Sequence, residues 1–267
     1  MLSTSTYHIH ITYFPVRARC EPVLLILADS GTQFEYEEIP QVKWVEMKKA
    51  GQVTPAMFPY GGVPILRVTD KSSKQRSEFL LGETSAILSY LEEIVTLPGT
   101  TLNKDLPLQT RARTQMIKEA SLFFTNRVWG LSVEEDWLAP PSRDKIWKAI
   151  TVRYLRNTEA ALGELQKEMR VVPEEMGPLT ALHATVAAAI TFITQVFPSV
   201  KRGLVPGGNF PLCGQLWIAV MTRPRIVAYW KEHAIAEKAW TITEYGTAEW
   251  IAREAAKYDS PSLLAKL

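Results

Sequence analysis

Three short stretches of the sequence carry groups that could bind and activate a small ligand. Tyr13 places a hydroxyl directly after an alternating run, 7–12, that predicts a β-strand. Val63 and Pro64 follow a Gly-Gly turn, where a cis proline would leave nearby backbone groups open to an extended ligand. Glu83-Thr84-Ser85 begins a predicted helix, whose N-terminal N–H groups favour a carboxylate. Together they suit a short peptide with its anionic end at the helix and its reactive atom near Tyr13.

A small α/β unit would bring these stretches together, and the first 96 residues predict one. The expected elements, in chain order, are a strand at 7–12, a helix at 23–29, a strand at 32–39, an irregular segment with Lys43, Trp44, Lys48 and Lys49, a strand at 63–68, a polar hairpin tip at 70–77, a strand at 78–81 and a helix at 86–92. This order is β-α-β-irregular-β-β-α.

The pattern then becomes helical. Leu97-Pro98-Gly99-Thr100-Thr101 predicts a linker. Apolar residues recur at helical spacing over 116–128, 146–165 and 182–193. We therefore predict an α/β domain over residues 1–96 and an all-α domain over residues 108–267.

The order of these motifs resembles the glutathione transferase family. The matching blocks are Tyr-Phe-Pro-Val-Arg-x-Arg-Cys from Tyr13, Leu-Ala-Asp-x-Gly, Trp44, Gly-x-Val-Pro, and Glu-Thr-Ser-Ala-Ile-x-x-Tyr-Leu from Glu83. The first block is most similar to the tyrosine-type classes, pi in particular. The resemblance implies a thioredoxin-like first domain, a helical second domain that forms a hydrophobic substrate site, glutathione as cosubstrate, and a homodimer.

The same resemblance implies roles for particular residues. Tyr13 would donate its hydroxyl to the glutathione sulfur and favour the thiolate, with Arg19 as a second catalytic residue. A thiol pKa of ~8.5 leaves only about 3% thiolate at pH 7, and lowering it by ~2 units requires ~2.7 kcal/mol. The residues matched to glutathione binding are Trp44, either Lys48 or Lys49, Val63, Pro64, Glu83, Thr84 and, across a dimer interface, Glu119. Those expected to line the hydrophobic substrate site are Tyr13, Phe14, Phe123, Phe124 and Trp129.

One stretch departs from the family pattern. Family members often begin a core helix of the second domain with Ser/Thr-x-x-Asp, a capping arrangement. Here the corresponding stretch is Thr180-Ala181-Leu182-His183. Either His183 replaces the acid structurally or the equivalent stretch lies elsewhere.

For a few other polar residues a structural role outweighs a chemical one. Cys20 falls within the first predicted helix, where we expect a buried thiol and not a nucleophile. His8 and His10 share one strand face, but the sequence places no third ligand near them, so we predict no metal site. Arg17 is interpreted as a solvated charge.

Composition narrows the classes of function. The 30 basic and 28 acidic residues give a net charge of +2, which disfavours nucleic-acid binding. No apolar run approaches the ~20 residues that cross a bilayer, and the first residues lack the features of a secretion signal. The two cysteines are no disulfide framework. We expect a cytoplasmic protein without a membrane or nucleic-acid partner.

The resemblance predicts a glutathione transferase that adds the thiolate to an electrophilic, hydrophobic small molecule, as in detoxification. One alternative is glutathione-dependent cis-trans isomerisation of a conjugated double bond, a chemistry of some fungal relatives in secondary metabolism. Another is a non-catalytic binding or interaction module with this fold. Sequence features separate the last from the enzymes, because a module kept for its shape need not retain Tyr13, Pro64, Glu83 and Thr84.

Overall fold

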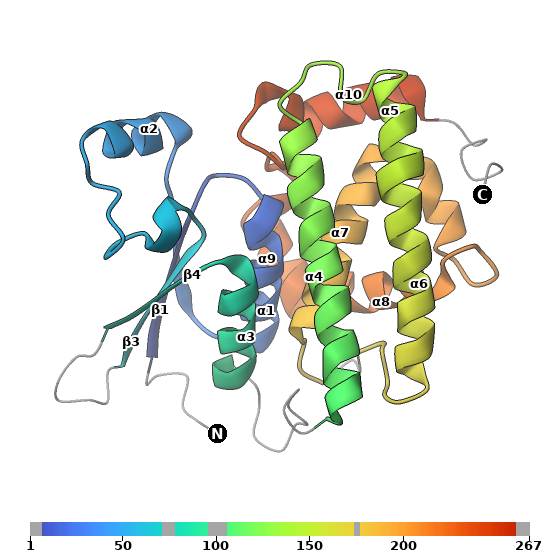
Figure 1. The fold of residues 1–267 in the computed structure, drawn as a ribbon, viewed down its shortest axis with the longest axis horizontal. Coiled ribbons are helices and arrows are strands. Elements are labelled where there is room, and N and C mark those ends of the chain that lie inside the picture. The colour runs from blue at the N-terminus through green and yellow to red at the C-terminus, as the bar shows by residue number, and fades with distance from the viewer. Residues whose placement is uncertain (1–6, 71–77, 96–105, 174–176, 260–267) are drawn as a thin grey trace.

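The computed structural model describes residues 7–70, 78–95, 106–173 and 177–259 (Figure 1). The elements of its first part are β1 (Tyr7–Tyr13), α1 (Glu21–Ser30), β2 (Phe34–Glu38), α2 (Gln41–Lys49), β3 (Ile65–Asp70), β4 (Glu78–Gly82) and α3 (Thr84–Val95), with 3₁₀ turns at Ala18–Cys20 and Pro59–Gly61. The predicted linker at 97–101 and most of the predicted hairpin tip, 71–77, lie outside the described residues.

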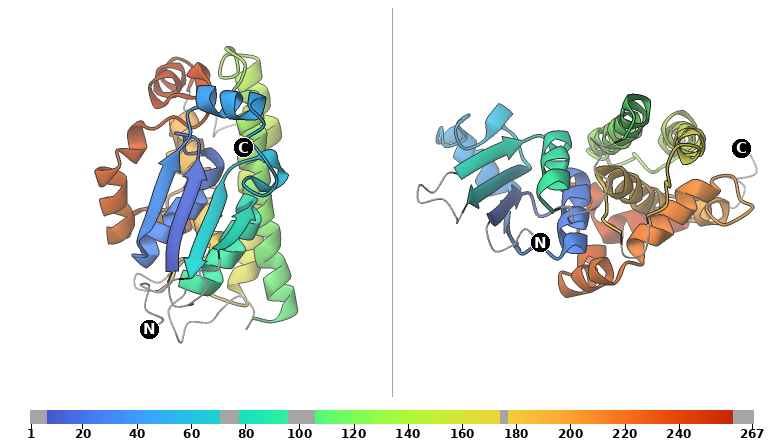
Figure 2. Two further views of the ribbon diagram at one scale, coloured as in Figure 1. Left: turned by 90° about the vertical axis from the view of Figure 1, so that its left-hand side faces the viewer. Right: turned by 90° about the horizontal axis from the view of Figure 1, so that it is seen from below.

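A mixed four-stranded sheet, in the order β2-β1-β3-β4, forms the first layer. β1 pairs in parallel with β2 and antiparallel with β3, and β3 pairs antiparallel with β4. Ile9 and Ile11 of β1 are buried, as the alternating pattern predicts. Helices α1 and α3 cover the sheet face that is turned toward the helical part, and α2 lies beyond the opposite face near one end (Figure 1 and Figure 2).

The expectation of irregular structure around Trp44 is wrong, because residues Gln41–Lys49 form helix α2. Trp44 is the one buried residue of this helix, and Val42 and Val45 face the solvent. The helix therefore lacks the continuous apolar stripe that helical periodicity detects. Pro40, directly before the helix, is the sequence signal that could have identified its start.

The second part of the chain is helical throughout its regular structure. Its elements are α4 (Leu108–Leu131), α5 (Ser142–Lys145), a π-helical turn (Ile146–Thr151), α6 (Val152–Gln166), α7 (Ala181–Val196), α8 (Pro211–Met221), α9 (Pro224–Glu232) and α10 (Ala248–Tyr258), with 3₁₀ turns at Pro198–Gly203, Ile235–Glu237 and Glu244–Gly246. Every residue of α7 except Gln195 is buried. Because α7 packs against α1, α4, α8 and α10, it is the centre of the helical layer.

The start of α7 resolves the departure noted at His183. The Thr180 hydroxyl accepts a hydrogen bond from the His183 backbone N–H, and the Thr180 backbone N–H donates to His183 Nδ1 at 3.2 Å. His183 thus replaces the acid of a capping box. Burial lowers the pKa of its imidazole to about 4, so the ring is neutral and Nδ1 can accept that bond.

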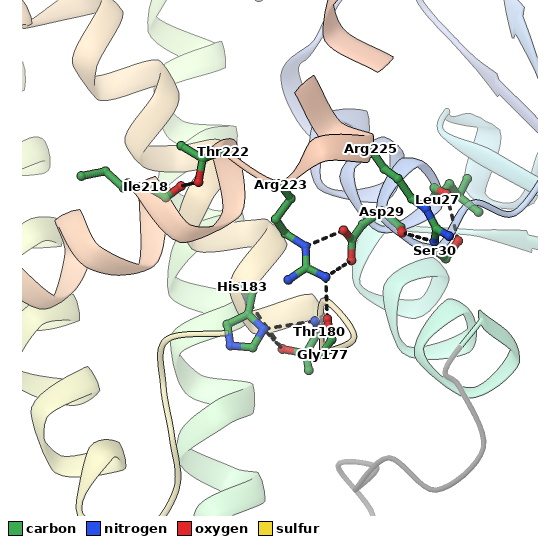
Figure 3. A network of polar contacts seen from close by, with 10 residues as sticks. All are labelled: Leu27, Asp29, Ser30, Gly177, Thr180, His183, Ile218, Thr222, Arg223 and Arg225. Atoms are coloured by element: carbon green, nitrogen blue, oxygen red, sulfur yellow. Dashed lines mark hydrogen bonds and ion pairs between the residues drawn. The ribbon is translucent and has the colours of Figure 1, made fainter. Parts of the chain in front are cut away.

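The two parts are joined by a buried ion pair at the C-terminal end of α1 (Figure 3). The Asp29 carboxylate accepts two hydrogen bonds from Arg223, which precedes α9, one of them 2.8 Å long from Nη2. Arg223 also donates to the Gly177 carbonyl at 2.5 Å, and Arg225 donates to the Asp29 carbonyl at 2.9 Å. Such charge-assisted bonds fix how α1 lies against the helical layer.

Candidate functional site

The pairing of the strands brings the three predicted stretches to the same end of the sheet. Thr12 pairs with Ile65, and Ile65 pairs with Gly82. Tyr13 is the residue after Thr12, Pro64 the residue before Ile65 and Glu83 the residue after Gly82, so all three lie at this end of the paired strands. The Val63–Pro64 peptide bond is cis, as expected. The hydroxyl, the proline turn and the start of α3 therefore meet where β1 ends.

The Tyr13 hydroxyl lies in a dry, partly cationic setting. Its side chain is 1% exposed, and the Arg19 backbone N–H donates to its oxygen at 3.3 Å. Burial raises the pKa of the phenol to about 12, against the opposing influence of the Arg19 charge. At neutral pH the hydroxyl is protonated and can donate a hydrogen bond to an anion.

Arg19 connects this hydroxyl to α3. The Thr84 hydroxyl donates to the Arg19 carbonyl at 3.3 Å, so Tyr13, Arg19 and Thr84 form one hydrogen-bonded chain. The Arg19 guanidinium carbon lies 5.2 Å from the centre of the Trp129 ring. The 3₁₀ turn at Ala18–Cys20 places the arginine here, between the end of β1 and the start of α1.

The residue before α3 adopts a conformation that leaves the helix start open. Glu83 is exposed and has φ +65°, a backbone conformation that is uncommon for a non-glycine residue. Thr84 is the first residue of α3, so unpaired N–H groups of the first helical turn lie beside Glu83. Glu119 of α4 accepts a hydrogen bond from Ser85 of the same chain, which places this carboxylate next to the α3 start.

An aromatic contact ties α2 to the site. The Phe14 ring lies 5.6 Å from that of Tyr13 and meets Trp44 edge-on at 5.8 Å, and Trp44 meets Phe58 in the same way at 5.0 Å. Lys48 and Lys49 are exposed on α2. Because residues four apart share a helix face, Lys48 lies on the face of Trp44 and Lys49 does not.

The structure does not bring all the predicted hydrophobic-site residues to Tyr13. Phe14 and Trp129 lie beside the Tyr13–Arg19 pair, as described above. Phe123 is 65% exposed, and Phe124 stacks on Tyr154 with the two ring centres 4.5 Å apart. Both line a groove of about 520 Å³ whose walls are α4, the π-helical turn and α6. No residue of the sheet or of α1 to α3 contributes to that groove.

The interpretation of Arg17 as a solvated charge is wrong. Its side chain is 1% exposed and forms an ion pair with the equally buried Glu21, with Nη2 2.7 Å from Oε1. Its guanidinium carbon lies 4.4 Å from the centre of the Trp230 ring and 4.0 Å from that of Trp240. The i,i+4 spacing of Arg17 and Glu21 was available in the sequence, whereas no local signal pointed to the tryptophans.

A small cavity adjoins this cluster, and of its lining residues the sequence analysis had singled out only Trp129. Its volume is about 10 Å³, and its lining residues are Ala18, Thr125, Val128, Trp129, Phe192, Trp240 and Thr241. Ala18 precedes Arg19 in the chain, and the Trp129 ring lies 5.2 Å from the Arg19 guanidinium carbon, but neither Arg19 nor Tyr13 lines the cavity. The other walls come from α4, α7 and the segment after α9, so only the folded chain assembles them.

The remaining polar candidates have structural partners. Cys20 lies in the 3₁₀ turn directly before α1 and not within the first helix as predicted. It is fully buried, as expected, and burial raises the pKa of its thiol well above the usual range. His8 lies 3.0 Å from Glu35 and His10 3.4 Å from Glu37, both on β2. Within the described ranges, no group of three His, Cys, Asp or Glu side chains could hold a metal ion. Likewise, no described helix is long and apolar enough to cross a membrane.

Comparison with known proteins supports the family resemblance. No family model matches the chain. Over 93 residues it is 29% identical to the class-mu 28 kDa glutathione S-transferase isozyme of Schistosoma japonicum, a match that covers 35% of this chain and 40% of the relative. Over 81 residues it is 35% identical to glutathione S-transferase P 1 of Xenopus laevis, covering 30% and 33%. The chain thus spans well under half the length of these curated relatives.

Solved structures extend the likeness to the whole fold. The sigma-class glutathione transferase of Fasciola hepatica superposes with a TM-score of 0.63 at 18% identity, covering 85% of this chain and 97% of that one. The pi-class enzyme of Onchocerca volvulus gives a TM-score of 0.57 at 16% identity, covering 91% and 99%. The predicted fold class, a thioredoxin-like domain followed by a helical domain, is confirmed, and so is the resemblance to glutathione S-transferases.

Proposed function

We propose that this chain, with its glutathione S-transferase fold and relatives, activates glutathione as a thiolate and adds it to an electrophilic, hydrophobic small molecule. The observation that carries the proposal is the hydrogen-bonded chain of Tyr13, Arg19 and Thr84 at the C-terminal end of β1. A hydroxyl with a raised pKa, a cation and a helix start converge there. These are the groups that a peptide with a thiol and a carboxylate needs.

In this proposal Tyr13 donates its hydroxyl hydrogen to the glutathione sulfur. The phenol remains protonated because burial raises its pKa to about 12, so the thiol is the group that loses its proton. The Arg19 charge favours the anion from nearby. A charge-assisted hydrogen bond in a dry site contributes about 1.5–3 kcal/mol, which matches the ~2.7 kcal/mol that a shift of ~2 units in the thiol pKa requires.

The rest of the glutathione molecule would lie along the same end of the sheet. Val63 and Pro64 would pair with its cysteinyl backbone. Glu83 and Thr84, at the start of α3, would receive its γ-glutamyl end, with Glu119 close by through Ser85. Trp44 and Lys48 of α2 would bind the glycine carboxylate, since they share one face of that helix.

We also propose a cytoplasmic homodimer. Several large apolar side chains stand exposed along the turn before β3, the edge strand β4 and α4: Tyr60 at 89%, Phe79 at 44%, Met116 at 55% and Phe123 at 65%. A second copy would cover them and the exposed edge of β4. Molar mass in solution tests this part directly, and a monomer at micromolar concentration would contradict it.

The test of the central proposal is the ultraviolet absorbance of the thiolate while glutathione is titrated into the protein. We expect a thiolate band that the Tyr13→Phe variant loses, together with about a hundredfold fall in conjugation rate, the loss typical of one removed anion-stabilising donor. Thr125→Val, which removes a hydroxyl at the cavity and not at the sulfur, is the control and should keep the band.

Other outcomes would select the alternatives. Glutathione binding without a band would move the activating role from Tyr13 to Arg19. A product with the mass of the substrate would favour glutathione-dependent isomerisation, whereas a retained sulfur adduct would favour conjugation. Absence of glutathione binding would leave a non-catalytic binding module with this fold.

A further inference from the structure

Helix α3 meets its neighbour α4 through polar side chains (Figure 1). The Ser85 hydroxyl donates a hydrogen bond to Glu119 Oε1, and one turn later along α3 the Ser89 hydroxyl accepts a hydrogen bond of 3.0 Å from Lys118 Nζ. Because residues four apart share a helix face, both bonds lie on the same face of α3. The first two turns of α3 are therefore tied to α4.

The start of α3 is also held from the side of the sheet. The Thr84 hydroxyl donates to the Arg19 carbonyl, and the Arg19 backbone N–H donates to the Tyr13 hydroxyl. Ile87 and Leu91, on the face of α3 that is turned away from the two serines, are fully buried. The start of α3 thus lies between the loop of Tyr13 and α4, and its position depends on the bonds to both.

Lys118 is an unusual residue at such a junction, because its side chain is only 3% exposed. Burial lowers the pKa of its ammonium group, against the opposing charges of Glu92 and Glu119. Lysine is rarely buried to this extent, and an apolar side chain of similar volume is often as stabilising as a buried charge, or more so. A contact that served only to join two helices would not need a lysine here.

Glu119, the residue after Lys118, keeps one carboxylate oxygen for a ligand. Its Oε1 accepts both the Ser85 bond and a bond of 2.6 Å from Gln115 Nε2. Among the described residues, none donates a hydrogen bond to Oε2. The side chain is exposed beside the start of α3, so a cationic group bound at that helix start can reach Oε2.

We propose that Lys118 is a positioning residue for the γ-glutamyl end of glutathione, because its bond to Ser89 fixes how the start of α3 lies relative to Glu119. The inference rests on the proposed function, since it concerns the ligand of the same site. The γ-glutamyl end carries a carboxylate, which suits the N–H groups at the α3 start, and an ammonium group, which suits Glu119 Oε2. Lys118 is buried and acts through these groups without touching the ligand.

A matched pair of thiol peptides measures this role: glutathione and cysteinylglycine, which is glutathione without its γ-glutamyl unit. The quantity to compare is the dissociation constant of cysteinylglycine divided by that of glutathione, from calorimetry, with displacement of glutathione for the weaker ligand. A ratio well above one in the unsubstituted chain reports the contribution of the γ-glutamyl unit. A general loss of structure weakens both ligands and leaves the ratio unchanged.

We expect Lys118→Met to lower this ratio about three- to tenfold, the factor for one net hydrogen bond, while the thiolate band remains at saturating glutathione. Methionine fills the space without the donor, so the variant should unfold at the same urea concentration or a higher one. Ser89→Ala removes the acceptor of the same bond and should lower the ratio as well. Ser89 is exposed, so this variant also serves if Lys118→Met fails to fold.

Thr114→Val is the control. Thr114 lies one turn before Lys118 on the same face of α4 and is also 3% exposed, but its hydroxyl bonds within its own helix, to the Thr110 carbonyl at 2.9 Å. It should leave the ratio unchanged. An unchanged ratio in both Lys118→Met and Ser89→Ala, an equal fall in Thr114→Val, or a ratio near one in the unsubstituted chain would overturn the proposal alone. Absence of glutathione binding to the unsubstituted chain would overturn the proposed function as well.

Discussion

The two ends of helix α1 both join the sheet to the helical layer through a buried arginine, yet they differ in what else they touch. At the C-terminal end, Asp29 binds Arg223 among other backbone and capping bonds (Figure 3). At the N-terminal end, Glu21 binds Arg17, whose neighbours include the cavity wall Trp240 and the loop of Tyr13. The same kind of ion pair is therefore structural at one end and adjacent to the chemistry at the other.

Breaking the C-terminal pair should cost stability and leave the chemistry intact. In Asp29→Asn the Arg223 guanidinium loses its buried counter-charge, for which we expect a loss of about 3–5 kcal/mol in the free energy of unfolding. Urea unfolding followed by tryptophan fluorescence measures it. The thiolate band should persist below the unfolding transition, and Glu164→Gln, at an exposed ion pair, should leave the midpoint unchanged. Loss of the band in folded Asp29→Asn protein would show that the two ends are coupled.

The histidine cap at the start of α7 should make the free energy of unfolding depend on pH. The pKa of His183 is lowered from 6.5 to about 4 by burial, so the unfolded chain takes up a proton in this range and the folded chain does not. The contribution of the neutral His183 ring to the free energy of unfolding is present above pH 6.5 and is lost as the pH falls toward 4. By linkage the loss amounts to about 3 kcal/mol.

His183→Asn isolates this effect, because asparagine can accept the Thr180 N–H bond and does not titrate. Unfolding free energies at a series of pH values should fall less steeply for the variant than for the unsubstituted chain. Parallel curves would mean that His183 titrates in the folded protein much as it does in the unfolded chain. The thiolate band should be the same in His183→Asn as in the unsubstituted chain. That result would sharpen the contrast between the two ends of α1.

The two ends also differ in how far sequence could predict them. Tyr13, Pro64 and Thr84 belong to short motifs whose strand and helix neighbours are local, so the sheet register alone brings them together. The environment of Arg17 depends on tryptophans from the far end of the chain, which no local pattern connects to it.

The helical part shows the same limit. Helical periodicity cannot say which neighbour a face will meet. The resemblance therefore placed Phe123 and Phe124 with Trp129 in one substrate site, although the two phenylalanines line another groove. Helix α2 escaped prediction because its apolar residues are mostly exposed. The Thr180–His183 spacing was visible, but the capping role of a histidine needed the pKa that burial imposes.

The smallest effect we expect distinguishes two adjacent lysines at the ligand-binding end. Trp44 is buried against Phe14, which fixes the rotation of α2, and Lys48 follows one turn later on that face. An exposed lysine that binds a carboxylate contributes about 0.5–1 kcal/mol, so Lys48→Ala should weaken glutathione binding about two- to fivefold by calorimetry at low salt, whereas Lys49→Ala should not. Because exposed pairs are screened, the difference should shrink as salt is raised. Equal weakening by both variants would show that the lysines act only through general positive charge, and the rotation of α2 would then carry no information about the ligand.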